Sequence, residues 1–251
     1  HEKLAKKIIE AHVPNLNVCL SSIVSPEIGE YERTSTSVAN AYVQPIFKSY
    51  VTSLVKGLKK IGITNDLFLM LSDGGIVHQK TAIEFPIRLV QSGPAGGAQA
   101  ATLYGKILKQ NNILCFDMGG TTAKICLLKN STPYKSSSFE FGRINGNKPG
   151  SGIKIKVPSI EMLEIGSGGG SIANIDELGL IKIGPNSAGS NPGPICYDLG
   201  GSNITISDVN LLLGYLSDNT KLAGYLSLNK VKAVNQVKKV ATNNSYDYEE
   251  F

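Results

Sequence analysis

The sequence is poor in the side chains that usually build metal clusters and catalytic triads. It has no tryptophan, three histidines and four cysteines, and no two cysteines stand in a Cys-x-x-Cys spacing. A structural zinc site is therefore not expected. The cysteines are better explained as buried thiols that pack like small hydrophobic side chains in a reducing compartment, which indicates a cytoplasmic protein.

Long apolar runs and concentrated charge are absent as well. No stretch approaches the ~20 apolar residues of a membrane span, and no signal peptide is evident. The net charge of +5 comes from scattered lysines that are not interleaved with aromatic residues. We therefore expect neither a membrane nor a nucleic acid as a partner. With 41% apolar and 18% charged residues, the composition is that of a globular protein with a real core.

What is abundant is glycine, with 27 residues concentrated in a few loops. One of these loops interrupts the segment 112–128. Apolar residues 113–116 precede Asp117, and a second apolar run at 125–128 follows the sequence Gly-Gly-Thr-Thr at 119–122. This pattern predicts two buried strands joined by a tight turn, in which the paired glycines supply positive φ angles.

Such a turn can hold an anion. The main-chain N–H groups around Gly119 and Gly120, together with the hydroxyls of Thr121 and Thr122, can point at one spot and bind phosphate oxygens. Asp117, at the end of the first strand, is placed to hold a magnesium ion or its bound water. The alternative is a plain hairpin with a solvated aspartate, because short glycine motifs also occur without a ligand.

The remaining segments predict alternating helices and strands. Helical spacing predicts helices at residues 2–11, 31–61, 98–108, 208–216 and 231–237, the second of them broken or kinked at Pro45. Apolar runs and alternation predict strands at residues 16–24, 66–72, 153–157 and 204–206. The polar segment 131–147 is expected to be a loop or a mobile extension. The order of elements up to Leu128 implies a largely parallel sheet covered by helices.

Two small-residue segments allow two interpretations each. The segment 92–97, Ser-Gly-Pro-Ala-Gly-Gly, opens a helix whose unpaired N–H groups could bind an anion. Equally, its small residues could let the helix pack closely on a sheet. The loop 166–171, Gly-Ser-Gly-Gly-Gly-Ser, either brings backbone against a ligand or is a flexible connection.

Several of these motifs follow one another in an order that resembles the hydantoinase A and 5-oxoprolinase family, especially its N-methylhydantoinase A branch. The motifs are Glu30-Tyr-Glu-Arg-Thr-Ser-Thr36, Asn40-Ala-Tyr-Val-Gln-Pro45, Ser92-Gly-Pro-Ala-Gly-Gly97, Phe116-Asp-Met-Gly-Gly-Thr-Thr-Ala-Lys124, Gly166-Ser-Gly-Gly-Gly-Ser-Ile-Ala173, Gly184-Pro-Asn-Ser-Ala-Gly-Ser-Asn-Pro-Gly-Pro-Ile-Cys-Tyr197 and Ser207-Asp-Val-Asn210. Together they cover most of the chain.

The resemblance implies an α/β protein with the ribonuclease-H-like fold of actin, sugar kinases and heat-shock ATPases. Two domains of that fold close on ATP, and each contributes one phosphate-binding hairpin. The hairpin at Asp117 resembles the second. The first, of the type Asp-x-Gly-Gly-Thr, is expected upstream of His1, so the chain is expected to be an internal piece of a longer polypeptide. Residues 1–110 would be the later half of the first domain, and residues 111–251 most of the second.

The activity implied by the resemblance is ATP-dependent opening of a cyclic amide or imide, such as a hydantoin, an N-methylhydantoin or 5-oxoproline. Phosphate transferred to the amide oxygen would create a leaving group for attack by water, with Mg²⁺ and chain donors neutralising charge. In this scheme Asp117, Thr121 and Thr122 are catalytic, and Asp117 and Asp208 are metal ligands. The implied nucleotide-binding residues are Gly119, Gly120, Gly168, Gly169, Gly170, Ser171, Ser92, Gly93 and Gly96.

Two other functions stay open. One is the related ATP-dependent carboxylase subunit that activates a ketone. The other is a module that binds nucleotide, or only packs against a partner, without turnover. Lys124 stands where many relatives carry aspartate, which favours the N-methylhydantoinase branch and removes one metal ligand. A hydantoinase B-type partner subunit and homo-oligomers are both compatible with the sequence. The 251-residue chain alone is expected to be inactive.

Overall fold

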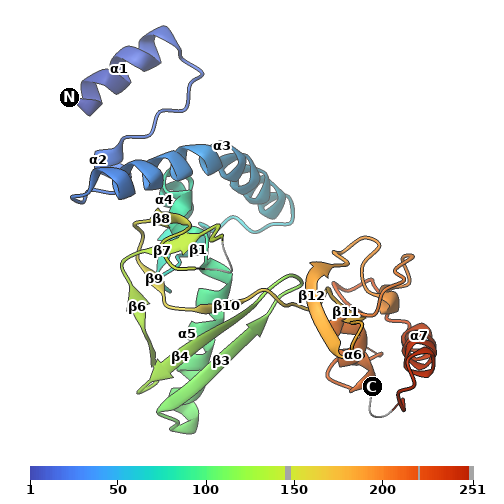
Figure 1. Ribbon diagram of the computed structural model, residues 1–251. Coiled ribbons are helices and arrows are strands. Elements are labelled where there is room, and N and C mark those ends of the chain that lie inside the picture. The colour runs from blue at the N-terminus through green and yellow to red at the C-terminus, as the bar shows by residue number, and fades with distance from the viewer. Residues whose placement is uncertain (145–147, 220, 249–251) are drawn as a thin grey trace. The chain divides into compact units, whose positions relative to one another are not determined.

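The computed structural model describes residues 1–144, 148–219 and 221–248 (Figure 1). The chain divides into two compact units, which are treated separately below. The first comprises residues 1–115 and 126–162, and the second comprises residues 116–125 and 163–251. This division differs from the expected boundary near residue 110, because residues 126–162 pack with the N-terminal part of the chain. The assignment to two ribonuclease-H-like domains stays a prediction.

Helices form most of the N-terminal part of the first unit. They are α1 (Glu2–His12), α2 (Ser21–Val24), α3 (Glu30–Lys60), α4 (Gln79–Glu84), the 3-10 helix η1 (Pro86–Leu89) and α5 (Ser92–Leu108). The helices expected at 2–11, 31–61 and 98–108 are confirmed. The strand expected at 16–24 is wrong, because its second half is α2. A short apolar run does not distinguish a buried strand from one buried helical turn.

The helix α3 runs for 31 residues and continues through Pro45, so the expected break does not occur. Its first turn carries Glu30 and Glu32 and its last turn two lysines, each complementing the helix dipole. Asn40 is fully buried at its middle. The Asn40 Nδ2 donates to the carbonyl of Glu84 at 3.1 Å, and Oδ1 accepts from the N–H of Ile87 at 3.3 Å. These bonds tie α3 to α4 and η1, which lie against it (Figure 1).

The strands of the first unit form small antiparallel pairs. The pairs are β1 (Phe68–Met70) with β2 (Ile76–His78), β6 (Lys135–Ser136) with β9 (Ser159–Ile160), and β7 (Phe139–Phe141) with β8 (Ile153–Ile155). The loop expected at 131–147 is therefore partly wrong, since the segment supplies β5 (Thr132–Pro133), β6 and β7. Its residues 145–147 lie outside the described part. The strand expected at 66–72 is shorter than predicted, and Phe68 is exposed.

The largest sheet has the strand order β10-β4-β3. Its members are β3 (Asn112–Met118), β4 (Ala123–Lys129) and β10 (Leu163–Ile165), and β5 (Thr132–Pro133) pairs with the far end of β4. The strand pairs described are antiparallel, so the expected parallel sheet is wrong. The alternation of elements in the sequence came from hairpins and short returning strands rather than from crossover helices.

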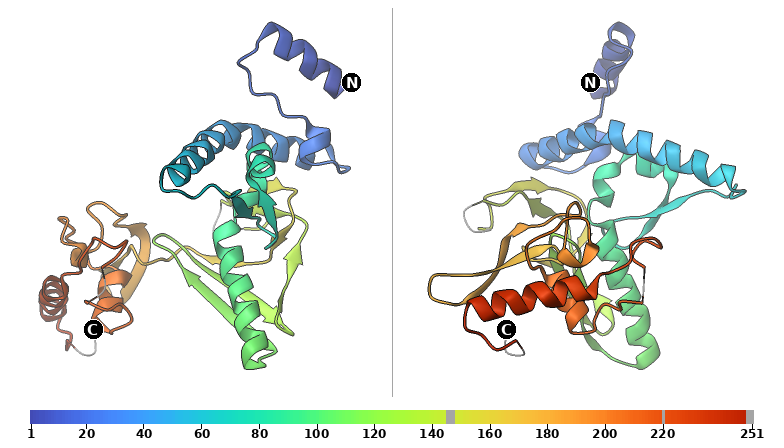
Figure 2. Two further views of the ribbon diagram at one scale, coloured as in Figure 1. Left: turned by 180° about the vertical axis from the view of Figure 1, so that it is seen from behind. Right: turned by 90° about the vertical axis from the view of Figure 1, so that its right-hand side faces the viewer.

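The core of the first unit has two clusters. In one, Ala95 and Ala98 of α5 pack on Cys126 and Leu128 of β4 and on Ile160, and α5 runs along the sheet (Figure 2). In the other, residues of α2 and η1 pack on Ile155 and Val157. The strand expected at 153–157 is shorter than predicted, because only residues 153–155 form β8; Ile155 and Val157 are buried as expected, whereas Ile153 is exposed.

The second unit contains the hairpin β11 (Ser171–Ile175) and β12 (Ile181–Ser187), followed by η2 (Ile195–Tyr197), α6 (Ile206–Leu212) and α7 (Lys230–Asn243). Helix α6 packs against α7 and β11 (Figure 2). The predicted last helix is confirmed, whereas the strand expected at 204–206 is a single bridge between Thr205 and Ile172. Among the described residues of the whole chain, no helix has the length and apolarity that crossing a bilayer requires.

Candidate functional site

The turn between β3 and β4 consists of residues 119–122, as the glycine pattern predicted. The N–H of Gly119 donates to the carbonyl of Thr122 at 2.9 Å. Neither Gly119 nor Gly120 has a positive φ, so that part of the prediction is wrong. The two strands are also more exposed than predicted, particularly β3. A left-handed backbone conformation therefore does not explain the glycines at these two positions.

A second glycine loop braces this turn from within the same unit. The N–H of Gly169 donates to the carbonyl of Gly119 at 2.9 Å, and the N–H of Gly170 donates to the carbonyl of Gly120 at 2.7 Å. A Cβ placed on Gly168 would lie 2.6 Å from the carbonyl carbon of Thr121 and 2.7 Å from the carbonyl oxygen of Gly119. Glycine at 168 is thus required for two backbones to touch.

The brace fixes the direction of two N–H groups. Within one trans peptide plane, the C=O of a residue and the N–H of the next residue point in opposite directions. Because the carbonyls of Gly119 and Gly120 face the bracing loop, the N–H groups of Gly120 and Thr121 face away from it. In the described part of the chain these two N–H groups have no acceptor, and both residues are exposed. Adjacent N–H groups that point the same way form an anion-binding nest.

Gly120 leaves room in front of this nest. A Cβ at Gly120 would meet no heavy atom within 4 Å. Packing within the chain therefore does not demand glycine there, in contrast to Gly168. The side chain of Thr121 is exposed, that of Thr122 is half-buried, and neither is engaged in a hydrogen bond within the described residues. Their hydroxyls are available to the same ligand as the nest.

Charged side chains flank the turn. Counting outward from the bond between Gly119 and Thr122 places Lys124 of β4 opposite Asp117 of β3, on the same face of the sheet. On its other side, Lys124 lies opposite Glu164 in the backbone register of the neighbouring strand β10. Asp117 is exposed and makes no ion pair with the described residues. The position of Lys124 beside Asp117 was missed from the sequence, although both residues are equally distant from the centre of the turn.

The bracing loop, residues 168–171, is itself held by hydrogen bonds within the second unit. Ser171 is buried, and its Oγ accepts a hydrogen bond from the N–H of Gly168 at 2.9 Å. The carbonyl of Gly169 accepts from the N–H of Ser207 in the first turn of α6, at 2.8 Å. The residues 168–171, expected at the nucleotide's sugar or base, thus have their N–H groups at 168, 169 and 170 engaged by the chain. Their visible role is to support the turn.

Asp208 serves the fold of the second unit. It is fully buried and forms a capping box with Thr205 at the start of α6. Its Oδ1 accepts from the N–H of Cys196 at 2.7 Å, and its Oδ2 accepts from the N–H and the hydroxyl of Thr205 at 2.9 and 2.8 Å. Both oxygens are therefore used by the chain, and Asp208 is left out of the metal site proposed below.

The expected residues Ser92, Gly93 and Gly96 belong to the first unit, at the start of α5. Ser92 is the first helical residue, and no side chain caps this helix end. A Cβ on Gly96 would lie 3.4 Å from the sulfur of Met70, whereas Gly93 faces open space. With Ala95 and Ala98 fully buried, close packing of α5 accounts for much of this segment. Its role at a nucleotide stays a prediction.

No cluster of three or more histidine, cysteine, aspartate or glutamate side chains fit to hold a metal occurs within residues 1–144, 148–219 and 221–248. Of the expected metal ligands, only the Asp117 carboxylate is uncommitted. An ion at this turn would have to complete its oxygen shell from water and from a bound phosphate, which is how Mg²⁺ is usually held. The nest and the two hydroxyls are groups that can hold phosphate oxygens, and the Asp117 carboxylate is a group that can hold Mg²⁺ directly or through water.

Comparisons with known proteins identify the family of this chain. Residues 33–251 match the family model described as hydantoinase/oxoprolinase, and the chain therefore belongs to that family. It is 41% identical over 244 residues to the uncharacterized protein MJ0964 of Methanocaldococcus jannaschii, covering 96% of this chain and 36% of the relative. It is 36% identical over 238 residues to caprolactamase subunit alpha of Pseudomonas jessenii, covering 95% and 33%.

A solved structure shares the fold. The nucleotide-free structure of acetone carboxylase, described as catalysing ATP-dependent acetone carboxylation, superimposes with a TM-score of 0.71 at 25% identity. The match covers 99% of this chain and 34% of that one. The chain thus spans about a third of the length of these relatives.

Proposed function

We propose that this chain is the phosphate-holding part of an ATP-dependent hydrolase that opens a cyclic amide or imide, of the hydantoin, N-methylhydantoin or 5-oxoproline type. The observation that carries the proposal is the pair of outward N–H groups at Gly120 and Thr121, held in place by the loop at 168–170. Membership of the hydantoinase/oxoprolinase family and the similarity to a caprolactamase subunit support the reaction class.

Each residue of the turn has a stated task in this proposal. The N–H groups of Gly120 and Thr121 and the hydroxyls of Thr121 and Thr122 hold phosphate oxygens, and Asp117 holds Mg²⁺ through its carboxylate or through bound water. Lys124, opposite Asp117, supplies positive charge near the transferred phosphate. ATP supplies the phosphoryl group that turns an amide oxygen into a leaving group. The chain contributes position and charge neutralisation, which dominate catalysis of phosphoryl transfer.

The wider architecture follows from the same resemblance. We propose a ribonuclease-H-like fold of the actin, sugar-kinase and heat-shock ATPase type, with this hairpin as the second of two phosphate-binding hairpins. Because the chain spans only about a third of its relatives, we propose that turnover needs parts of a longer protein. The relative from Pseudomonas jessenii is named as a subunit, so a hydantoinase B-type partner is part of the proposal.

A second candidate is an ATP-dependent ketone carboxylase subunit. The specific observation in its favour is the structural similarity to acetone carboxylase. Both candidates use the turn in the same way and differ only in the molecule that receives the phosphate. Substrate-stimulated ATP hydrolysis by the longer protein, measured with hydantoin, 5-oxoproline, and acetone plus bicarbonate, separates them.

The test for the turn itself needs only this chain. Titration with Mg·ATP, followed by calorimetry, should show binding that Asp117→Asn weakens by about tenfold, the effect of one lost charged contact. The matched control is Asp218→Asn, which changes an exposed aspartate of the same unit. Equal affinities for the chain, Asp117→Asn and Asp218→Asn would remove Asp117 from the site.

A further inference from the structure

Three charged side chains form a row across the sheet, beside the phosphate turn. They are Asp117 of β3, Lys124 of β4 and Glu164 of β10, and all three belong to the second unit. The register of β4 and β10 places Glu164 directly opposite Lys124, and the pairs on either side of it keep the same register. Side chains that lie opposite one another on neighbouring strands share one face of a sheet. Lys124 is therefore the middle member of the row, with one carboxylate on each neighbouring strand.

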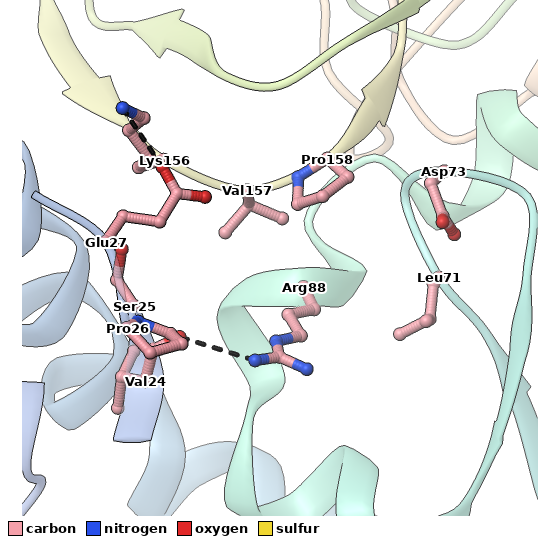
Figure 3. A pocket seen from close by; sticks show the side chains of 10 residues that line it. All are labelled: Val24, Ser25, Pro26, Glu27, Leu71, Asp73, Arg88, Lys156, Val157 and Pro158. Atoms are coloured by element: carbon pink, nitrogen blue, oxygen red, sulfur yellow. Dashed lines mark hydrogen bonds and ion pairs between the residues drawn. The ribbon is translucent and has the colours of Figure 1, made fainter. Parts of the chain in front are cut away.

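The ammonium group of Lys124 is committed to neither carboxylate. Lys124 is half-buried, and its Nζ forms no ion pair and no hydrogen bond with the described residues. Lys156 of the first unit shows the other case, because it is ion-paired with Glu27 at 3.0 Å (Figure 3). Two negative charges, one on each side, attract Lys124 in opposite directions. Its position therefore depends on the balance between Asp117 and Glu164.

That balance matters at Asp117, whose carboxylate is proposed to hold Mg²⁺. An ammonium group and a metal ion compete for the same carboxylate oxygens, because both are attracted by the same negative charge. Glu164 offers the lysine a second acceptor on the strand farther from Asp117. The position of Glu164 is fixed by the backbone, since β10 leads into the loop that braces the turn. Attraction of Lys124 toward Glu164 leaves more of the Asp117 carboxylate for the metal.

Glu164 also acts on a bound cation in a simpler way. Its negative charge attracts Mg²⁺ through space, whether or not a lysine stands between them. The two effects have the same sign, but only one of them depends on the presence of Lys124. A comparison of chains with and without this lysine therefore separates them.

We propose that Glu164 is a positioning residue that draws the ammonium group of Lys124 away from Asp117 and so keeps the Asp117 carboxylate available to the metal ion of Mg·ATP. The inference rests on the proposed function for the identity of the ligand. It assigns to Glu164 a task at the phosphate turn that is carried out through Lys124.

The experiment measures, by calorimetry, the affinity of the 251-residue chain for ATP with Mg²⁺ and for ATP with EDTA. The ratio of the two affinities is the gain due to magnesium. Glu164→Gln should lower this ratio about threefold to fivefold, the size of one cross-strand charge pair. The affinity for ATP in EDTA should not fall, whereas a chain damaged by the substitution would lose affinity under both conditions. The matched control is Glu177→Gln, which changes an exposed glutamate of the same unit and should leave the ratio unchanged.

The same substitution in a Lys124→Met chain separates positioning from attraction through space. Without a lysine to compete with the metal, Glu164→Gln should change the ratio by less than about twofold. A fall of the same size in the chains with and without Lys124 would overturn the inference, because Glu164 would then act directly on the cation.

Urea unfolding without nucleotide or metal gives an independent readout. In the unmodified chain Asp117→Ala should be neutral, because Lys124 has a second partner. In the Glu164→Gln chain the lysine has only Asp117 left, so adding Asp117→Ala should raise the equilibrium constant of unfolding about threefold. A neutral Asp117→Ala in both chains would overturn the inference.

The inference and the proposed function fail in different ways. Binding of Mg·ATP that Asp117→Asn weakens and Glu164→Gln leaves unchanged would overturn the inference and leave the proposed function standing. Absence of Mg·ATP binding by the unmodified chain would overturn the proposed function, and urea unfolding would still decide whether Glu164 positions Lys124.

Discussion

Two turns of this chain look alike in sequence and differ in structure. In Asp73-Gly74-Gly75, the aspartate Oδ1 accepts from the N–H of Gly75, and Gly74 takes a positive φ of 82°. In Asp117-Met118-Gly119-Gly120, the aspartate makes no such bond, and neither glycine has a positive φ. The first turn uses its aspartate and its glycine to hold its own shape.

The conformation of the second turn is held by hydrogen bonds from another segment of the chain. Its two glycine carbonyls accept hydrogen bonds from Gly169 and Gly170, which leaves the N–H groups of Gly120 and Thr121 free to bind something else. The comparison teaches that an acidic residue before paired glycines is not evidence of a ligand site by itself. What distinguishes the two turns is whether the aspartate side chain is used to hold the backbone of its own turn.

Among the substitutions that test the difference between the two turns, Gly168→Ala should have the largest effect on stability and binding. The new Cβ would lie 2.6 Å from backbone of the turn, so one backbone must move. We expect a loss of about 2 to 3 kcal/mol in the free energy of unfolding, as for overpacked sites, together with loss of Mg·ATP binding. Urea unfolding and calorimetry measure the two. Gly166→Ala, where a Cβ meets nothing within 4 Å, is the control in the same loop and should keep both properties.

Gly74→Ala should have the next largest effect. Its positive φ costs an L-residue about 1 to 2 kcal/mol. The nearby amide of Gln99 can swing away, so the backbone term should dominate. Gly120→Ala is the matching change in the other turn and should stay within about 0.5 kcal/mol of the unmodified chain. Equal losses for both variants in urea unfolding would mean that the two turns do not differ in backbone strain.

Replacing the aspartate of each turn should give a smaller difference in the free energy of unfolding. Asp73→Ala removes the bond to Gly75 and should cost about 1 kcal/mol of stability. Asp117→Ala removes no hydrogen bond within the described residues and should be neutral in the same urea titration. A destabilised Asp117→Ala chain would show that Asp117 has a structural task.

The smallest expected effect is a slow reaction at the base of the hairpin. Burial, with a smaller contribution from neighbouring Cys115, raises the pKa of the Cys126 thiol to about 11. Its thiolate fraction at about pH 8 is therefore very small and rises about tenfold for each pH unit up to that value. Iodoacetamide at this pH should modify half-buried Cys19 well before Cys126, as mass spectrometry of digested peptides would show. Comparable rates would mean that the hairpin opens readily.

Much of the local structure was predictable. The helices α3 and α7 and the strands on either side of Gly119 follow from apolar periodicity and from glycine at the turn, which act over a few residues. The strand expected at 16–24 failed because a short apolar run fits both states, and tertiary contacts decide between them. The parallel sheet failed because alternation of elements does not distinguish crossover connections from hairpins.

The candidate site was likewise predictable only in part. The sequence by itself determined that Asp117 and two threonines surround a glycine turn, because those residues are neighbours in the chain. Only the tertiary structure decided that Gly169 and Gly170 orient that turn, that Asp208 is committed to the N–H of Cys196, and that the Ser25 hydroxyl is buried without a hydrogen-bond partner among the described residues. The physical reason is that each of these facts depends on which distant donor meets which acceptor, and no local pattern of residues specifies that meeting.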